Sequence, residues 1–511
     1  MTRQPRSLDT VLLADPGLDD LAGASLGTAR VLADDEDTTE DFALLDTFDG
    51  SLMGSGRMLV AAGPDMLLLR AGAAPLRQAA ADPGFVQAMP YGEVTAELAA
   101  CVDPLRVLLP LAKGQVRRQG LKLVDDLDKT VARCRVLLFA TEAGRRAALV
   151  EFRPLRGYDA EMAQLRALVT ALGREPDNPG EVACALAGPE AAYSNKPRVE
   201  MAPTDSAFRV ANAVIRANLA AARRNEHGVI ADLDTEFLHD YRVALRRIRS
   251  VVSLFKGVYT AEQTEELRSR FNALMAPTGR LRDLDVYMLE RGRYTAMAPE
   301  EFRPGLEKLF DSLATDRETA RRTLGRRLRS EAYAKEVRSL EKLVASRKKL
   351  HRGPAAGRDA LDFAQALTWK RYRKVCRIAA TIDDDTEDEQ IHALRIQCKK
   401  LRYLIEIFAP LFDPAETAKV LKSLKKLQNT LGDFNDCAVQ QAELHEMLDR
   451  LDPNTTPDAV EIAAAVGALI SLLHGRQLDH RARVVSSFAA FDSDTTRTRV
   501  RSLFKPGKAS A

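Results

Sequence analysis

The stretch His239-Asp-Tyr-Arg-Val-Ala-Leu-Arg-Arg-Ile-Arg249 decides the fold of the C-terminal part of the chain, because it occurs twice. The second copy is His392-Ala-Leu-Arg-Ile-Gln-Cys-Lys-Lys-Leu-Arg402, 153 residues further on. The histidine and the first and last arginines coincide, and every intervening basic residue meets a basic residue. Downstream, Leu274–Asp283 and Leu427–Asp436 align at the same offset without a gap. Two motifs that share one ungapped offset predict two copies of one helical unit.

Each copy, placed on a helix at about 100° per residue, separates an apolar side from a basic stripe. No acidic residue interrupts either stripe, although like charges one turn apart repel by roughly a few tenths of a kcal/mol per pair. A solvated face would mix both signs, so the unmixed stripes predict an anionic ligand between the two helices. The apolar sides hold Leu238, Tyr241, Leu245, Ile248, Val252 and Phe255 in the first copy and Leu394, Cys398, Leu401, Ile405 and Phe408 in the second. The stripes hold His239, Arg242, Arg246 and Arg249 in the first copy and His392, Arg395, Lys399 and Arg402 in the second.

The spacing of the stripes suits a chain of phosphate groups. Cations on successive turns of a helix lie about 5.4 Å apart along its axis. Guanidinium groups bind phosphate oxygens through paired hydrogen bonds, and lysines add point charges. Two facing stripes would therefore line a trough for an extended polyanion. Further basic runs, at 321–329, 370–374 and 419–426, are more typical of solvated helix faces.

The composition of the 511-residue chain excludes some classes of protein. Hydrophobic residues make up 46% of it, which is enough for large cores and excludes a mostly disordered chain. Aromatic residues make up 6%, with one tryptophan, which argues against a stacking platform for single-stranded nucleic acid. The six cysteines are scattered with no C-x-x-C pair, so we expect reduced thiols and neither a zinc site nor a disulfide framework.

The charge is distributed unevenly along the chain. Residues 1–200 hold 22 basic and 29 acidic side chains, a net charge of −7, whereas residues 201–511 hold 53 and 43, a net charge of +10. The C-terminal part is therefore the candidate for an anionic partner. A charge of this size is ordinary for some 300 residues, so the placement of the cations carries more weight than their number.

Two domains are expected. Residues 1–175 mix short apolar runs with glycine-containing turns, which predicts an α+β domain closed by a helix over Asp159–Leu172. The breaker Glu175–Gly180 marks a boundary, and residues 176–203 are predicted as a linker. From 204 to 505 the apolar residues recur at three- and four-residue intervals, which predicts long helices in two repeats, at about 204–350 and 360–505.

The helical half resembles the CHAD domain, the conserved histidine α-helical domain. The resemblance rests on the two histidine motifs and on Leu281-Arg-Asp-Leu-Asp285 and Leu431-Gly-Asp-Phe-Asn-Asp436, in the expected order. It implies an all-α domain of two pseudo-symmetric four-helix bundles around a basic channel, which binds inorganic polyphosphate and associates with polyphosphate granules. The residues that carry over as ligand contacts are the eight of the two stripes, with Lys422 and Lys426 as further cations. Arg282, Asp283, Asn435 and Asp436 are expected to brace helix ends.

The N-terminal half is similar to a CYTH domain, the triphosphate tunnel fold, over Leu45–Asp49, Val116–Arg133 and Phe152–Tyr158. The family's E-x-E-x-K signature belongs on the first strand, where this chain has Leu8-Asp-Thr-Val-Leu-Leu13, with one carboxylate and no lysine. A tunnel triphosphatase needs carboxylates to hold Mg²⁺. We therefore expect a degenerate CYTH-like domain without hydrolase activity or catalytic residues, which serves for docking or structural support. An unrelated α+β domain is the alternative.

The histidines of the stripes have two alternative roles. Each is suited either to direct phosphate contact or to a hydrogen bond that bridges helices. Glu236 and Glu389 precede the histidines by three residues, the spacing found in di-metal bundle sites. A row of cations beside a metal would oppose its binding, and these glutamates equally favour a helix N-terminus. We expect no metal and no cofactor.

These observations predict non-enzymatic binding of inorganic polyphosphate. The alternatives are a CYTH-type triphosphatase or polyphosphatase and a general polyanion or nucleic-acid binder; nucleic acid is disfavoured by the few aromatics and the lack of a recognition-helix motif. Neither a secretory h-region nor a run of about 18 apolar residues is visible, so no membrane partner is expected. We expect a cytoplasmic protein located on polyphosphate granules, with the N-terminal domain available to a protein partner.

Overall fold

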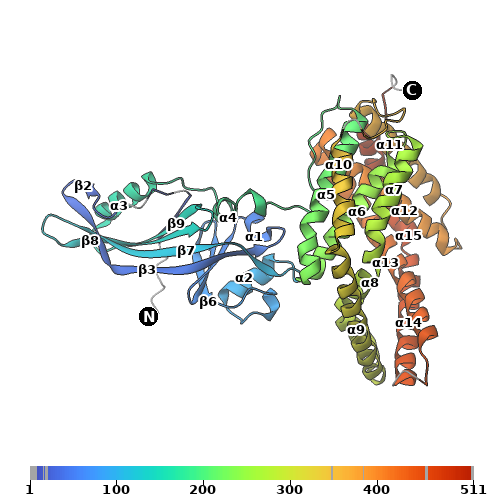
Figure 1. Ribbon diagram of the computed structural model, residues 1–511, viewed down its shortest axis with the longest axis horizontal. Coiled ribbons are helices and arrows are strands. Elements are labelled where there is room, and N and C mark those ends of the chain that lie inside the picture. Colours follow the sequence, from blue (N-terminus) through green and yellow to red (C-terminus); the bar gives the residue numbers. More distant parts are fainter. Residues whose placement is uncertain are drawn as a thin grey trace. The chain divides into compact units, whose positions relative to one another are not determined.

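The computed structural model describes residues 9–14, 16–17, 21–346, 349–383, 385–454 and 458–507. The chain forms two compact units, Met1–Ser194 and Asn195–Ala511 (Figure 1). The first is built on an antiparallel sheet and the second is helical, in agreement with the predicted fold class.

The sheet of the N-terminal unit runs in the order β1-β9-β8-β7-β3-β4-β5-β6, with β2 paired to β3, and every pairing is antiparallel. The sheet curls so that strands from its two ends come together. Arg77 of β6, at one end of the strand order, forms an ion pair with Glu151 of β9, near the other end. Gly114 permits close approach of β7 to β8, since a Cβ there would collide with the carbonyl oxygen of Ala140. The strands are β1 (Asp9–Ala14), β2 (Ser25–Leu26), β3 (Ala29–Thr47), β4 (Met58–Ala62), β5 (Asp65–Arg70), β6 (Ala73–Ala79), β7 (Leu108–Val124), β8 (Thr130–Thr141) and β9 (Arg146–Arg153).

Helices cover both faces of this sheet. The alternation along β8 and β9 sends Val150 and Phe152 to a core under α3 (Asp159–Ala171), and Leu149 to a second core under α4 (Pro179–Ala187). The short α1 (Ser51–Gly54) and α2 (Glu93–Cys101) pack at the end near β4 and β5. The helix predicted over Asp159–Leu172 is therefore confirmed as α3.

The predicted linker 176–203 is wrong in its first part. Residues 179–187 form α4, whose Val182, Ala183 and Leu186 are buried against the sheet. The run Glu175–Gly180 indicates a boundary in the sequence, but Pro179 fits the first turn of a helix because its missing N–H is not needed there. The N-terminal unit accordingly continues through α4.

The helical unit consists of two copies of one arrangement. The first copy holds α5 (Ala207–Ala231), α6 (Thr235–Leu254), α7 (Ala261–Met275), α8 (Gly279–Met297), α9 (Arg303–Leu328) and α10 (Glu331–Ala345). The second holds α11 (Ala360–Ala379), α12 (Asp388–Phe408), α13 (Pro414–Arg450), α14 (Ala459–Arg481), α15 (Val484–Phe491) and α16 (Asp494–Phe504). At the offset of the sequence repeat, the starts of α5, α6, α7 and α10 coincide with those of α11, α12, α13 and α15. The chief difference is that residues 276–278 separate α7 from α8, whereas α13 runs through the equivalent position unbroken.

Equivalent residues of the two copies meet, which is the mark of a pseudo-twofold axis. The rings of Phe255 and Phe408, which are equivalent in the repeat, stack with centroids 5.0 Å apart. Ser206 and Asp359, a second equivalent pair, form an antiparallel bridge just before α5 and α11. Only an axis that passes between the copies places a residue against its own counterpart. Helices α6 and α12 contact each other and lie beside this axis, because the stacked rings stand at their ends.

The two copies also share a hydrophobic core, formed by α8 and α9 with α13 and α14. The segment Ala459–Phe491, which spans α14 and α15, is long and apolar enough to cross a membrane by length and composition, a test that core helices also pass. Its residues Ile462, Leu469 and Leu473 lie in this shared core. Packing between the copies therefore accounts for apolar positions of α14.

Candidate anion-binding site

The basic stripes stand at the edges of two helices whose apolar sides are anchored in the core. The carboxylate of Asp234 accepts hydrogen bonds from the backbone N–H groups of Glu236 and Phe237 and thereby caps α6. All the residues predicted for the apolar sides are buried, including Leu245 and Cys398 at 0% exposure. The stripe residues are half-buried, except His392, which is exposed. The helices thus hold both stripes at the boundary between core and solvent.

The two stripes face each other across the pseudo-twofold axis. Burial, together with the neighbouring cations Arg395 and Arg246, lowers the pKa of Lys399 to about 8. Burial also lowers the pKa of Arg395, and Arg246 adds to that effect. Arg246 belongs to α6 and the other two to α12, so charges of the two copies lie close enough to repel. Arg246 and Lys399 are moreover equivalent residues.

We call these six cations, from α6 and α12, the basic cluster: Arg242, Arg246, Arg249, Arg395, Lys399 and Arg402. Burial is the main cause of a lowered pKa of Arg242 as well, with contributions from Arg246, Arg282 and Arg249. Half-buried cations that lie beside one another destabilise the ligand-free protein, because they repel each other and have lost part of their hydration. An anion among them would reverse this effect.

Acidic residues neutralise part of the cluster. Arg395 forms an ion pair of 3.2 Å with Asp436, and Asp283, at the equivalent position, opposes the lowering of the pKa of Arg242. Glu406 pairs with Arg402 at 3.4 Å and with the buried Arg247 at 3.3 Å. These acids offset the charge of three members of the cluster.

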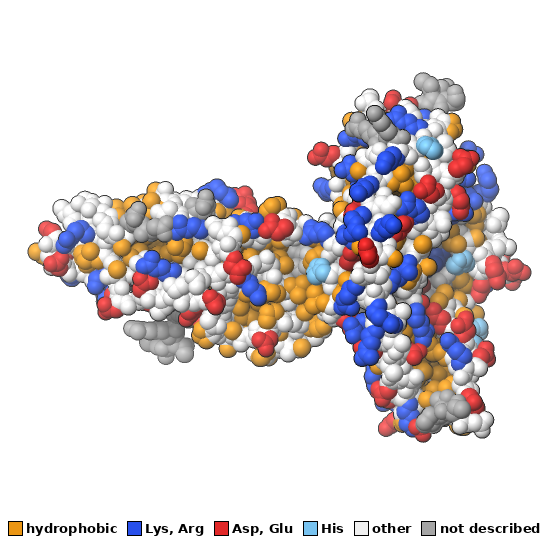
Figure 2. Space-filling model, in the orientation of Figure 1, with side chains coloured by type: hydrophobic (Ala, Val, Ile, Leu, Met, Phe, Trp, Pro, Cys, Tyr) orange, Lys and Arg blue, Asp and Glu red, His pale blue; other side chains and the backbone are white. Residues whose placement is uncertain are grey.

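Three cations of the cluster have no acidic partner. Within the described part of the chain, no carboxylate oxygen lies within 4.0 Å of Arg246, Arg249 or Lys399. Figure 2 shows Lys and Arg side chains over much of the helical unit, with Asp and Glu among them. What distinguishes Arg246, Arg249 and Lys399 is therefore the combination of partial burial with missing counter-charge, rather than the presence of cations.

The two stripe histidines differ in their surroundings. His392 shares a hydrogen bond between its Nδ1 and Oδ1 of Asn435, which bridges α12 to α13. Because an amide oxygen only accepts, Nδ1 carries the proton and Nε2 is left for another partner. His239 is half-buried on α6, and the residue equivalent to Asn435 in its copy is Arg282. The bridging role proposed for these histidines thus holds for His392.

The expectation that Asn435 and Asp436 brace a helix end is wrong. Both lie in the interior of α13, because the second copy lacks the break that starts α8 in the first. Their side chains hold His392 and Arg395 instead. Sequence reasoning placed these residues beside the site but missed that they orient its basic side chains.

Lys422 and Lys426 are exposed on α13. At about 100° per residue, Lys422 lies about 40° and Lys426 about 80° round the helix from Asp436. Lys425, which was not among the predicted contacts, lies only about 20° from it. Lys425, eleven residues or about three turns before Asp436, is therefore the lysine of this run that shares the face of α13 with Asp436.

The charges inside the N-terminal sheet are largely paired with one another. Arg118 contacts Glu40 at 3.2 Å, and Arg135 contacts Glu36 at 2.9 Å. Glu151, whose side chain is 3% exposed, accepts ion pairs from Arg77 and Arg135. Among the described residues, no group of three or more His, Cys, Asp or Glu is placed to hold a metal ion.

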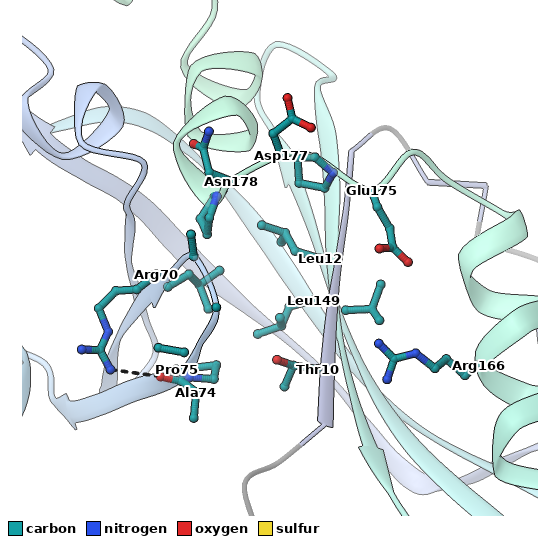
Figure 3. Close-up of a pocket in the computed structure, with 17 residues that line it drawn as sticks. Thr10, Leu12, Arg70, Ala74, Pro75, Leu149, Arg166, Glu175, Asp177 and Asn178 are labelled. Atoms are coloured by element: carbon teal, nitrogen blue, oxygen red, sulfur yellow. Dashed lines mark hydrogen bonds between the residues drawn. The ribbon is translucent and has the colours of Figure 1, made fainter.

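A cavity of about 560 Å³ lies where β1 approaches the β5–β6 turn (Figure 3). Thr10 and Leu12 of β1 line it beside Leu149, with Arg166 and Asp177 at its rim. Positions 10 and 12 of the first strand therefore carry a hydroxyl and an apolar group toward this cavity. The two carboxylates that line the cavity, Glu175 and Asp177, come from the segment before α4 and not from β1.

Comparisons with known proteins agree with the helical architecture. Residues 213–445 match the CHAD domain family model. Two uncharacterized proteins of Mycobacterium tuberculosis, MT2285 and Rv2226, are 28% identical over 220 residues and 27% identical over 216. Each match covers 40% of this chain and 39% of the relative, so the chain spans about two fifths of the length of these relatives.

Two solved structures are similar to part of the chain. The CHAD domain from the plant Ricinus communis aligns with a TM-score of 0.48 at 24% identity, over 62% of this chain and 99% of that one. PptA from Streptomyces chartreusis aligns with a TM-score of 0.41 at 16% identity, over 56% and 99%. From the repeated histidine motif, the paired helical copies and the family match, the helical unit of this chain is a CHAD domain.

Proposed function

We propose that the helical unit binds inorganic polyphosphate at the basic cluster without altering it chemically. The observation that carries this proposal is the pair Arg246 and Lys399, equivalent cations of α6 and α12 that lie near each other with no acidic partner among the described residues. An anion that contacts both copies at once would relieve their repulsion. A chain of phosphates supplies many negative charges in a row, which matches cations at successive turns.

Polyphosphate fits the cluster better than a nucleic acid does. The members of the cluster are arginines and a lysine, which bind phosphate oxygens through charge and paired hydrogen bonds. Nucleic-acid binding without sequence preference also uses aromatic side chains on which bases stack. The stripes contain histidines but no such row of aromatics, so the chemistry favours a ligand made of phosphates alone.

For the N-terminal unit we propose a degenerate CYTH-like domain that serves in docking or support rather than in hydrolysis. The pairing of Arg118 with Glu40 and of Arg135 with Glu36 supports this, since these two cations of the sheet already have acidic partners. Release of phosphate from triphosphate or short polyphosphate, measured with Mg²⁺ and with Mn²⁺, tests it. Turnover that depends on either metal would contradict the proposal.

The binding proposal is tested with long-chain polyphosphate at several salt concentrations. We expect affinity to fall steeply with salt, because bound phosphates release counterions. The variant Arg246→Met with Lys399→Met should bind at least about tenfold more weakly, since two charge-assisted contacts are lost. The matched control is Lys335→Met with Arg338→Met, two exposed cations of α10, which should bind as the unmodified protein does.

Two outcomes would count against the proposal. If the Arg246→Met and Lys399→Met variant binds polyphosphate unchanged, the basic cluster is not the binding site. Nucleic acid, duplex or single-stranded, is added as a competitor at matched phosphate concentration. If it competes as well as polyphosphate does, the protein is a general polyanion binder. We further propose a cytoplasmic location on polyphosphate granules, which a fluorescent fusion in cells with and without granules would test.

A further inference from the structure

A second group of cations surrounds Lys400 of α12, which follows Lys399 of the basic cluster. It combines Arg371 and Lys374 of α11, Lys400 of α12, and Lys256, which follows the end of α6. We call these four residues the outer cation group. They come from three segments of the chain and from both copies.

Contacts between α11 and α12 hold this group together. The guanidinium of Arg371 donates a hydrogen bond to Oε1 of Gln397. Lys400 lies one turn after Gln397, and Lys374 lies one turn after Arg371, so both lysines flank this contact on the same sides of their helices. Lys256 follows Phe255, whose ring stacks on Phe408 of α12. The fold, and not a run in the sequence, thus brings the four side chains into one region.

Arg371 and Lys400 of this group are half-buried, Lys374 and Lys256 are exposed, and the group lacks counter-charge. Burial lowers the pKa of Arg371 and is also the largest cause of a lowered pKa of Lys400, to which Arg371, Lys374 and Lys256 add. Over the residues that the structure describes, no carboxylate comes within 4.0 Å of any of the four. Withdrawing cations from water without an anion is costly, so an arrangement of this kind is typical of a site for an anion.

The group is not a by-product of the internal repeat. Arg371 and Lys374 correspond to Asn218 and Ala221 in the first copy. Lys400 corresponds to Arg247, which has an acidic partner in Glu406. The cations that α11 and α12 contribute therefore have no unpaired counterparts at the equivalent positions of the first copy, although the underlying helices are alike.

We propose that the outer cation group is a second anion-binding site, which takes phosphate groups. This inference rests on the charges between α11, α12 and the end of α6, and it stands whether or not the basic cluster binds polyphosphate. The phosphates come from one of two sources: a further stretch of a polyphosphate chain held at the basic cluster, or a separate short polyphosphate such as triphosphate.

Calorimetric titration with inorganic triphosphate at low salt tests the site. The full-length protein should bind two triphosphates, and Lys374→Met with Lys400→Met should bind one. The matched control, Lys335→Met with Lys342→Met on α10, should bind two. If the outer variant binds the same number with the same affinity as the unmodified protein, the proposal is overturned.

The same titration separates this proposal from the proposed function. The variant Arg246→Met with Lys399→Met should lose the other triphosphate and keep the one at the outer group. If that variant is unchanged while the outer variant loses binding, the proposed function fails and the second site stands. The opposite pattern overturns the second site alone. Lys374→Met by itself, at an exposed position, should weaken binding at least about threefold and serves if the double variant does not fold.

Long-chain polyphosphate distinguishes the two sources. If one chain spans both groups, the outer variant binds long chains about tenfold more weakly, with an unchanged number of chains per protein. If the ligands are separate, long-chain affinity is unchanged and triphosphate still binds the outer group in the presence of the long chain. Equal long-chain affinity together with unchanged triphosphate binding would contradict both forms of the proposal.

Discussion

Phe255 and Phe408 occupy the same position in the two copies, and their rings stack with centroids 5.0 Å apart and an interplanar angle of 8°. Both are almost fully buried, and each follows or ends a helix that carries a basic stripe. The pseudo-twofold axis therefore passes between two aromatic rings, and this contact packs the end of α6 against the end of α12, the two helices that carry the stripes.

Replacing Phe408 by alanine should destabilise the helical unit and weaken ligand binding together. Truncation of a buried phenylalanine costs about 3–5 kcal/mol, and here it removes the partner of Phe255 as well. Urea unfolding measures the free energy, and polyphosphate binding under native conditions measures the site. A milder Phe408→Leu variant should retain most of both. A loss below about 1 kcal/mol for Phe408→Ala would contradict a central role for this contact.

Lys399 should make both stability and binding depend on pH. Its pKa of about 8 in the folded protein lies below that of a lysine in the unfolded chain, so the unfolded state binds more protons between these values. Stability of the ligand-free protein should therefore rise as the pH increases from about 8 to about 10.5, through this residue. Polyphosphate affinity should fall over the same range, because the free protein loses the charge that the ligand needs. Unfolding and binding measured from pH 7 to 10 check both trends.

Lys399→Met provides the control for this pH dependence. The variant should show a flatter change in stability and in affinity above pH 8, whereas Lys335→Met should behave as the unmodified protein does. Equal slopes in Lys399→Met and the unmodified protein would assign the effect to another group.

Glu406 should affect stability and binding in opposite directions. Its carboxylate pairs with Arg247 and Arg402, and the Arg247 pair is about nine-tenths buried on both sides. Glu406→Gln should lower the free energy of unfolding by about 3 kcal/mol, because a buried cation loses its partner. It should raise polyphosphate affinity by roughly two- to fivefold, since Arg402 is freed for the ligand. A fall in both quantities would mean that Glu406 shapes the site rather than competes with the ligand.

Asp436→Asn should strengthen binding with little loss of stability. Asp436 pairs with Arg395 but its own side chain is 64% exposed, so the pair contributes under about 1 kcal/mol to folding. Asp436 also opposes the lowering of the pKa of Lys399. Its removal should therefore move the pH at which affinity declines to a value below that of the unmodified protein. An unmoved pH profile would separate Asp436 from Lys399.

The local pattern of the sequence predicts much of this protein. The repeated histidine motif at one constant offset predicts two helical copies, and the apolar spacing predicts which sides of α6 and α12 are buried. These predictions succeed because they depend on residues three or four apart, which a helix places on one face. The predicted linker begins too early for the same reason, since the local pattern of Glu175–Gly180 does not show the core against which α4 packs.

Tertiary structure alone decides which charges meet. The sequence does not show that Arg246 and Lys399 are half-buried or that they lack acidic partners. It also does not show that Arg247 pairs with Glu406, because these residues belong to opposite copies. The outer cation group draws on segments at 256, 371–374 and 400. Electrostatic interaction depends on distance and on solvent exposure, and both are set by how the two copies pack around their axis rather than by the order of residues along either one.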